Sequence, residues 1–337
     1  MIDNHIKESI VTLMAACGLG EVTAAIKPVS GGFLHRMYRV EIPEGVFAVK
    51  YLNPEIMARP TAAGNFARAE EIERIFEEHG LPIVPALIFG GKKMQQVDEK
   101  FFYVFHWQSG HITDWHTIST EQCWKVGNIL GQMHAIAPEE MSEEEIASQE
   151  PEIRQTDWHG YTLRALEQGS EIASLLEGSE SLLAYADQEL NAARASLPNI
   201  TCLSNEDMDP KNVMWEGDAP WVIDLECLER GNPMSHVVQL ALQWAGTATC
   251  ELKPENLRVF LEGYLAAYDN GFRAYDTLYG IAYTWVEWLE YNIRRALGEC
   301  QDEAEQEMGI SEVKNTLERI AYLRQVEEIC KRELARN

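Results

Sequence analysis

The sequence has few basic residues and no long apolar run. Of its 337 residues, 28 are Lys or Arg and 54 are Asp or Glu, which gives a formal net charge of −26 at pH 7. A surface this acidic repels nucleic acids and anionic membranes, so we expect neither as a partner. No apolar stretch reaches the roughly eighteen residues that a membrane-spanning helix needs, so no such helix is expected.

Two features of secreted proteins are also absent. The N-terminus lacks a basic segment followed by an apolar one, so a secretory signal is not expected. The 7 cysteines include no Cys-x-x-Cys pair, and their odd number indicates free thiols in a reducing compartment. We therefore expect a cytoplasmic protein.

The acidity itself has two interpretations. Carboxylates that line a cleft would attract a cationic substrate, whereas carboxylates on solvated helix faces would only keep the protein soluble. Runs such as Glu143-Glu144-Glu145 favour the second interpretation for the surface as a whole. The first stays open for the region around the candidate site.

The first third of the chain combines helical and β patterns. Apolar residues recur at helical spacing over residues 4–17 and 65–79, and a glycine follows each segment. Strand-like segments are residues 33–42, 46–52, 83–89 and 101–105. The first two flank a Pro-Glu-Gly turn and are expected to form a hairpin, and the last two are expected to flank a polar loop. These patterns predict a small mixed lobe.

Helical patterns dominate after Trp107. A capping box of the form Ser-Thr-Glu-Gln begins at Ser119 and predicts the start of a helix. Residues 138–196 are acidic and helical in pattern, and residues 276–297 are expected to form a late helix. One face of that helix carries Trp285, Trp288, Asn292 and Arg295, which fits either a packed core or an acceptor-binding surface. No internal repeat and no low-complexity linker interrupts the chain.

A strand-like interlude over residues 201–225 carries the residues with the clearest chemistry. Asn212 follows Asp207 by five residues, and Asp224 ends the apolar run Trp-Val-Ile. These offsets are the spacing of a kinase catalytic loop. In such a loop the first Asp orients the attacking hydroxyl and accepts its proton. The Asn and the second Asp hold Mg²⁺ against the nucleotide phosphates, because hard cations prefer oxygen ligands.

The same segment resembles the signature of the aminoglycoside phosphotransferase and choline kinase superfamily. The family's catalytic loop reads His-x-Asp-x-x-x-x-Asn and its metal strand reads Ile-Asp-Trp/Phe-Glu. The string Asp-x-Asp-Pro-x-Asn-Val-x-Trp, which starts at Asp207, resembles a bacterial branch of the family. Other matching segments, in the family's order, are Val-Ser-Gly-Gly from Val29, Phe-Ala-Val-Lys ending at Lys50, Gly-Leu-Pro-Ile-Val-Pro from Gly80 and Gly-x-x-Leu-x-x-Met-His ending at His134.

The resemblance, which spans most of the chain, implies a protein-kinase-like two-lobed α+β fold. Its small N-terminal sheet lobe would bind the nucleotide, and its larger, mostly helical C-terminal lobe would carry catalysis and substrate binding. The change of pattern near Trp107 places these lobes at residues 1–106 and 107–337. The implied activity is transfer of the γ-phosphoryl group of ATP or GTP, with Mg²⁺, to a hydroxyl of an amine-bearing or sugar-like small molecule. The residues do not indicate an oligomeric state.

The resemblance also assigns roles to single residues. Asp207 is expected to be catalytic, and Asn212 and Asp224 are expected to bind the metal. Lys50 is expected to pair with a carboxylate of the helix over residues 65–79, either Glu70 or its neighbour, and we choose Glu70. The expected nucleotide-binding residues are therefore Lys50, Glu70 and the turn residues Ser30, Gly31 and Gly32.

Three positions depart from the family's pattern. Asn205 stands where the loop His is usual, and His236 stands where an Asp is common. Glu206 adds a negative charge beside Asp207, which is expected to raise the pKa of that carboxyl group. The alternative function is therefore a catalytically weakened, kinase-like binding or structural protein.

Overall fold

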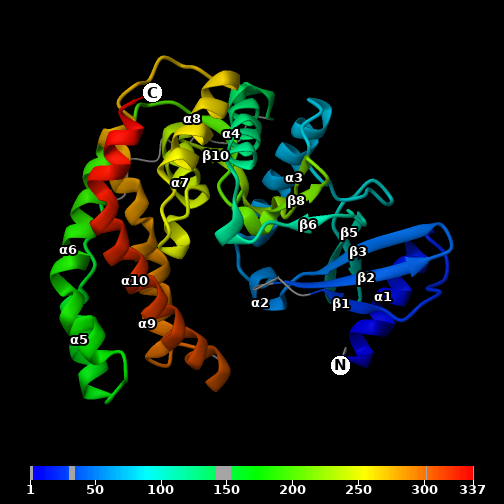
Figure 1. Cartoon of the computed structure of the whole chain (residues 1–337). Coiled ribbons are helices and arrows are strands. Elements are labelled where there is room, and N and C mark those ends of the chain that lie inside the picture. Colours follow the sequence, from blue (N-terminus) through cyan, green and yellow to red (C-terminus); the bar gives the residue numbers. More distant parts are fainter. Residues whose placement is uncertain (1–2, 30–34, 142–152, 301, 337) are drawn as a thin grey trace. The chain divides into compact units, whose positions relative to one another are not determined.

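The computed structural model describes residues 3–29, 35–141, 153–300 and 302–336 (Figure 1). The chain forms two compact units. The first comprises Met1–Thr113 and Asn205–Glu229, and the second comprises Asp114–Ser204 and Arg230–Asn337. Compactness by itself assigns no function to a unit, so the functional division expected between residues 106 and 107 stays a prediction.

A five-stranded antiparallel sheet forms the centre of the first unit, with strand order β1-β2-β3-β5-β4. The strands are β1 (Lys27–Val29), β2 (Arg36–Ile42), β3 (Gly45–Tyr51), β4 (Gln95–Val97) and β5 (Lys100–His106). The predicted hairpin is confirmed, since β2 and β3 pair with Val40 opposite Phe47.

Helices cover both faces of this sheet. Apolar residues of α1 (Asn4–Ala16) pack with Val40, Phe102 and Val104, whereas residues of α3 (Ala62–Glu78) pack with Tyr103. Successive side chains of a strand point to opposite faces, so the alternation along β5 places α1 and α3 on opposite sides. A short helix, α2 (Pro54–Met57), follows β3. Both predicted helices of this unit are therefore confirmed.

The prediction of a strand over residues 83–89 is wrong. That segment makes only isolated bridges, one of them from Ile83 to Val222. Its Pro85 has no N–H to donate to a ladder, which disfavours a paired strand. The strand β4 lies instead within residues 90–99, which the sequence predicts to be a loop.

A second, three-stranded sheet completes the first unit, with strand order β6-β8-β9. Its strands are β6 (His111–Ile112), β8 (Val213–Glu216) and β9 (Ala219–Val222). The short strands β7 (Cys202–Asn205) and β10 (Leu228–Gly231) carry the chain between the two units. The candidate catalytic loop lies between β7 and β8, and Asp224 lies two residues after the end of β9.

The second unit is helical. Its helices are α4 (Thr120–Ala135), α5 (Trp158–Glu167), α6 (Ala173–Ala195), α7 (Pro233–Trp244), α8 (Pro254–Ala267), α9 (Trp285–Ala296) and α10 (Glu303–Leu334). The capping box at Ser119 is confirmed, with both of its hydrogen bonds present. The predicted late helix is divided into a 3-10 segment, Tyr275–Thr284, and α9.

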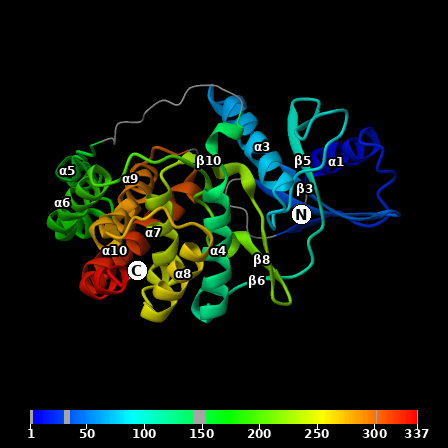
Figure 2. The ribbon, with the colours of Figure 1, turned by 90° about the horizontal axis from the view of Figure 1, so that it is seen from above.

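Close packing of α4 against α8 organises this unit, and the two helices lie side by side in both views (Figures 1 and 2). A Cβ atom added to Gly127 of α4 would lie 2.1 Å from the carbonyl oxygen of Phe260. Only glycine therefore allows this approach. Aromatic side chains fill the remaining core, and those that are fully buried include Trp244, Tyr264, Tyr275, Tyr279 and Tyr283. Over the described residues, no helix has the length and apolar character needed to cross a membrane.

A buried ion pair stabilises the first unit and gives a test of its packing. The Nζ atom of Lys93 lies 2.7 Å from Oε1 of Glu73 on α3, and their side chains are 7% and 8% exposed. The same carboxylate oxygen accepts a hydrogen bond of 2.6 Å from the N–H of Ala86. Burial raises the pKa of Glu73, although the hydrogen bond and charge of Lys93 oppose this rise.

We expect Glu73→Ala to lower the free energy of unfolding by about 3–5 kcal/mol, because it leaves the Lys93 ammonium buried without its partner. Urea unfolding measures this loss. The double variant Glu73→Leu/Lys93→Met is expected to recover most of it, since no buried charge remains. An equal loss in the double variant would show that lost packing, rather than the unpaired buried charge, causes the destabilisation.

Candidate active site

Lys50 lies at the centre of the candidate site. It is a residue of β3, it is 5% exposed, and it lies opposite Tyr103 of β5. Its Nζ atom lies 2.7 Å from Oδ1 of Asp224 and 2.7 Å from Oε1 of Glu226. Burial opposes the charged form of Lys50, but the two carboxylates outweigh it and raise the pKa of the amine. Lys50 is therefore a fixed cation beside two carboxylates.

His35 holds Glu226 from its other side. The Nδ1 atom of His35 accepts a hydrogen bond of 2.9 Å from the N–H of Asn53, so Nε2 carries the ring proton. Nε2 lies 2.9 Å from Oε2 of Glu226. Burial opposes ionisation of Glu226, but the bond from His35 and the charge of Lys50 outweigh it, and the pKa of Glu226 is lowered. Glu226 thus connects Lys50 and His35 as a carboxylate.

Asn212 brings the catalytic loop to the strand that precedes Asp224. It is 4% exposed, and its side-chain nitrogen donates a hydrogen bond of 2.8 Å to the carbonyl oxygen of Asp207. Its own carbonyl oxygen accepts a bond of 2.9 Å from the N–H of Ile223. The antiparallel pairing of β8 with β9 places these segments together. The three predicted site residues, Asp207, Asn212 and Asp224, therefore converge.

Asp224 has an uncommon backbone conformation. Its φ and ψ angles are 59° and 67°, in the left-handed region that side chains other than glycine rarely adopt. Such conformations cost of order 1–3 kcal/mol and gather at functional sites, where surrounding structure holds them. Main-chain bonds from Val222 to Pro82 and from Val84 to Val222 fix the strand before Asp224. The conformation turns the carboxylate toward Lys50.

The carboxyl group of Asp207 is harder to ionise than that of an ordinary Asp. Burial raises its pKa to about 6, Lys211 opposes the rise, and Asp209 and Asp224 add to it. The sequence correctly indicates a raised pKa, but it attributes the rise to Glu206. Burial and the carboxylates on either side of the loop are the larger causes. Asp207 still reaches solvent, since its side chain is 35% exposed.

Asp209 shapes the loop, and Lys211 connects it to Asp207. The Oδ1 and Oδ2 atoms of Asp209 accept bonds of 3.0 and 2.8 Å from the N–H and the Nζ atom of Lys211. The same Nζ atom lies 3.3 Å from Oδ1 of Asp207. Burial raises the pKa of Asp209, while Lys211 works against this rise. Lys211 is a contact of the candidate base that the sequence does not single out.

Asn205, which replaces the family's usual His, is part of the loop's own architecture. It is 0% exposed, and its Oδ1 atom accepts a hydrogen bond of 3.0 Å from the N–H of Asp207. Its Nδ2 atom is buried and has no hydrogen-bond partner among the described residues. Asn205 therefore positions the Asp207 backbone through a local turn, a role that suits an amide oxygen.

We expect Asn205→His combined with Glu206→Arg to strengthen neither magnesium-nucleotide binding nor turnover, because Asn205 already holds the Asp207 N–H from a fully buried position. Steady-state kinetics and calorimetry measure turnover and binding in this variant. Asn205→Ala is expected to lower the free energy of unfolding by about 0.5–1.5 kcal/mol, the contribution of one hydrogen bond, and urea unfolding measures this loss. A gain in the double variant would mean that Asn205 is a poor substitute for His.

The structure does not bring Glu70 to Lys50. The Tyr103 hydroxyl donates a hydrogen bond of 2.7 Å to Oε1 of Glu70, and burial and Glu70 raise the pKa of Tyr103. Lys50 has Asp224 and Glu226 as partners instead, because its side chain extends toward the loop after β9. Nucleotide contact by Glu70 stays a prediction. Ser30, Gly31 and Gly32 lie outside the described residues.

The donor set at this site fits a divalent cation such as Mg²⁺. Lys50 bonds the carboxylates of Asp224 and Glu226, and Lys211 bonds those of Asp207 and Asp209, so four carboxylates face two ammonium groups. Asn212 uses its nitrogen in the loop, so its oxygen is the atom suited to a cation. Hard cations prefer such oxygen ligands, and the excess negative charge favours their binding. Asn212 and Asp224 are the residues that would hold it.

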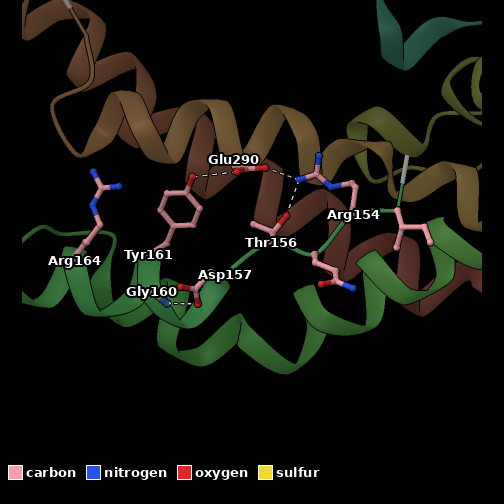
Figure 3. Close-up of a pocket in the computed structure, with 9 residues that line it drawn as sticks. Arg154, Thr156, Asp157, Gly160, Tyr161, Arg164 and Glu290 are labelled. Atoms are coloured by element: carbon pink, nitrogen blue, oxygen red, sulfur yellow. Dashed lines mark hydrogen bonds and ion pairs between the residues drawn. The ribbon is translucent and has the colours of Figure 1, made fainter. Parts of the chain in front are cut away.

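The second unit contains a pocket of about 580 Å³ (Figure 3). It is lined by Ile153, Arg154, Gln155, Thr156, Asp157, Gly160, Tyr161, Arg164 and Glu290. Glu290 of α9 accepts bonds from Arg154 at 2.5 Å and from the Tyr161 hydroxyl at 3.1 Å. Glu290 is thus paired with groups of the pocket itself. The pocket lining does not contain the Asp and Asn residues that the sequence predicts for catalysis and metal binding.

Comparison with known proteins identifies the family. Residues 25–281 match the model of the phosphotransferase enzyme family, and the chain belongs to this family. A search of curated proteins found no significant match. Solved structures share the protein-kinase-like, two-lobed α+β fold that the sequence predicts, which confirms the fold class.

Three of these structures illustrate the similarity. Spectinomycin phosphotransferase in complex with ADP and spectinomycin has 13% identity and a TM-score of 0.70, over 94% of this chain and 98% of that chain. A choline/ethanolamine kinase family protein from Mesorhizobium loti has 13% identity and a TM-score of 0.64, over 98% and 99%. Amicoumacin kinase has 12% identity and a TM-score of 0.59, over 94% and 96%. At these identities the similarity shows the fold alone.

Proposed function

We propose that the protein is a small-molecule kinase that transfers the γ-phosphoryl group of ATP or GTP to a hydroxyl group of an amine-bearing or sugar-like acceptor. The observation that carries the proposal is a chain of contacts. Asn212 bonds Asp207 and the main chain just before Asp224, and Asp224 bonds the buried ammonium of Lys50. Lysine, carboxylate and amide groups in this arrangement are the parts that phosphoryl transfer requires.

Each residue has a role in this mechanism. Asp207 accepts the proton of the attacking hydroxyl and orients its oxygen toward the phosphorus atom. Lys50, held by Glu226 when it is not in contact with phosphate, neutralises the charge of the nucleotide phosphates. Asn212 and Asp224 would hold Mg²⁺, which supplies further neutralisation of the phosphate oxygens when bound. The rigid loop bonds of Asn212 keep these groups in position during the reaction.

Similar structures support the choice of substrates. The spectinomycin phosphotransferase structure contains ADP, and the amicoumacin kinase structure contains AMP-PNP and Ca²⁺. Both proteins act on small molecules, as does an ethanolamine kinase of similar fold. All 7 cysteines are free thiols, which supports our proposal of a cytoplasmic location. We propose no nucleic-acid or membrane partner, in keeping with the net charge of −26.

A screen of amine and sugar alcohols for acceptor-dependent nucleotide consumption tests the proposal. ATP and GTP are supplied separately, with Mg²⁺, and product nucleotide is measured with and without each acceptor. We expect at least one hydroxyl-bearing acceptor to raise consumption well above the rate without acceptor. The same acceptor, methylated at its hydroxyl, is the matched control and is expected to be inert.

Asn205 favours a second candidate, a kinase-like protein that binds nucleotide but turns over weakly. The Asn205 Nδ2 atom is buried without a partner among the described residues, which is unusual for a fully assembled loop. A magnesium-dependent rise in Tm with nucleotide, together with acceptor-dependent turnover, would favour the enzyme. A rise in Tm without turnover would favour the binding protein.

Salt dependence tests whether the acidity of the site selects the acceptor. The site has more carboxylates than cations, so we expect an amine-bearing acceptor to be preferred. Its KM is expected to rise with salt while kcat changes little, because salt screens exposed charges beyond about 8 Å at physiological ionic strength. A neutral analogue of the same acceptor is the control. If the best substrate is neutral or anionic, or if KM does not change with salt, the acidic residues do not select the acceptor. Their role would then be to keep the protein soluble.

A further inference from the structure

Arg295 is a buried cation with an incomplete set of hydrogen bonds. It belongs to α9, and it is 8% exposed. Its Nη1 atom donates to Oδ1 of Asn292 at 3.1 Å, and its Nη2 atom contacts the Met308 sulfur at 3.4 Å. Its Nε atom is buried and has no hydrogen-bond partner among the described residues. A thioether is a weak acceptor, so only one of these contacts is a strong hydrogen bond.

The nearby acidic side chains bind other groups. Over the described residues, no carboxylate forms an ion pair with Arg295. Three of the acids on α9 and α10 have other partners: Glu287 pairs with Arg194 and Arg154, Glu290 with Arg154 and Arg294, and Glu312 with Trp288 and Arg319. A buried charge without a counter-charge costs several kcal/mol. An anion at this position would remove that cost.

The unsatisfied groups of Arg295 share one edge of the guanidinium. Its Nε and Nη2 hydrogens are parallel, so this edge matches the two oxygens of a carboxylate or phosphate group. Nη1, which Asn292 holds, belongs to the opposite edge. The contact with Asn292 therefore fixes the orientation of the guanidinium group. The Nε–Nη2 edge stays available for a ligand.

Two partly exposed side chains, Tyr291 and Met308, lie beside the guanidinium, and Met308 contacts its Nη2 atom. The guanidinium carbon lies 5.4 Å from the centre of the Tyr291 ring, and Tyr291 and Met308 are 47% and 46% exposed. Methionine has three rotatable bonds and moves at little cost. Close backbone packing keeps Arg295 in place, since a Cβ atom on Gly309 of α10 would lie 2.8 Å from the Cβ atom of Arg295. Movement of the Met308 side chain, with this backbone packing intact, is the step by which a small anion would reach the Nη2 atom.

We propose that the Nε–Nη2 edge of Arg295 binds the oxyanion group, a carboxylate or a phosphate, of a small-molecule ligand. The site is formed by Arg295, Asn292 and Tyr291 of α9 and by Met308 of α10, all in the second unit. The inference rests on the buried guanidinium and not on phosphoryl transfer, so it stands or falls independently of the proposed activity.

Thermal unfolding with added anions tests the site. Every sample is the full chain with the substitution Lys50→Met. Phosphate bound at the proposed nucleotide site then does not contribute to the change in Tm. Acetate and phosphate are compared with chloride at constant ionic strength. We expect acetate, phosphate or both to raise Tm over chloride by about 1–3 °C at ten times Kd. Acetate alone would assign a carboxylate ligand, and phosphate alone a phosphate ligand. No rise over chloride with either anion would overturn the proposal.

Variants locate the effect. Arg295→Met and Arg295→Lys are expected to lose the anion-dependent rise, the second because an ammonium group lacks the fork although it keeps the charge. Arg294→Met, on the same helix, removes an exposed arginine that pairs with Glu290, and it is the matched control that should retain the rise. Met308→Leu should retain or increase it. If Arg295→Met fails to fold, Arg295→Lys gives the comparison. A rise in Arg295→Lys equal to that in Arg294→Met would overturn the proposal.

Discussion

Replacing Asp207 by Ala is expected to lower kcat by roughly 10²–10⁴-fold, the contribution of a well-placed general base. The dissociation constant of the magnesium-nucleotide complex should change little, because Lys50, Asn212 and Asp224 remain. Asp207→Asn preserves the shape of the side chain and should show the same loss. Steady-state kinetics with the preferred acceptor measure kcat, and calorimetry measures nucleotide binding.

Asp218 provides a matched control for this prediction. It is an exposed Asp in the turn between β8 and β9, close in sequence to the site, and Asp218→Ala should keep kcat near the wild-type value. If Asp207→Ala and Asp218→Ala lowered kcat by the same modest factor, Asp207 would not be the catalytic base.

Replacing Asp224 by Asn is expected to have a different signature. Loss of one proposed metal-binding charge should weaken magnesium-dependent nucleotide binding by about 100-fold, the upper end of the change that loss of an outer-sphere partner gives. Asn tolerates the left-handed conformation of Asp224, so the backbone should stay in place. Calorimetric titration with and without Mg²⁺ separates the metal-dependent part of the affinity.

The contrast between Asp224 and Asp207 is the informative result. Asp224→Asn should lose affinity, and Asp207→Asn should lose turnover at nearly constant affinity. Lys50→Met should also weaken nucleotide binding, but in the absence of Mg²⁺ as well. Nucleotide binding that is unchanged in Asp224→Asn would place the metal site elsewhere in the chain.

The geometry of the candidate catalytic loop could be predicted from the sequence because its contacts are local. The spacing of Asp207 and Asn212 fits one tight loop, and the structure ties them with a single hydrogen bond. The hairpin of β2 and β3 was predictable for the same reason, since a turn separates two short apolar runs. In contrast, β4 has little apolar character of its own and depends on pairing with β5.

The partners of Lys50 could not be predicted, because they depend on tertiary contacts. Lys50 and Asp224 are 174 positions apart in the sequence, and their meeting requires the first unit to be folded. Glu226 was visible in the metal-strand motif, but its bond to His35 gave no sequence signal. Burial is likewise the main cause of the raised pKa of Asp207. The sequence suggests Glu206 as the cause, because burial cannot be read from neighbouring residues. The unsatisfied edge of Arg295 is equally invisible without the packing of α9 on α10.

Transfer of a radiolabelled γ-phosphate to the acceptor tests the central claim most directly. The wild-type protein, with Mg²⁺ and the acceptor found by the screen, is expected to move the label from the nucleotide to the small molecule. Asp207→Asn is expected to bind the same labelled nucleotide with unchanged affinity and to transfer almost none of the label. Transfer by Asp207→Asn at the wild-type rate would contradict the assignment of this loop as the catalytic centre.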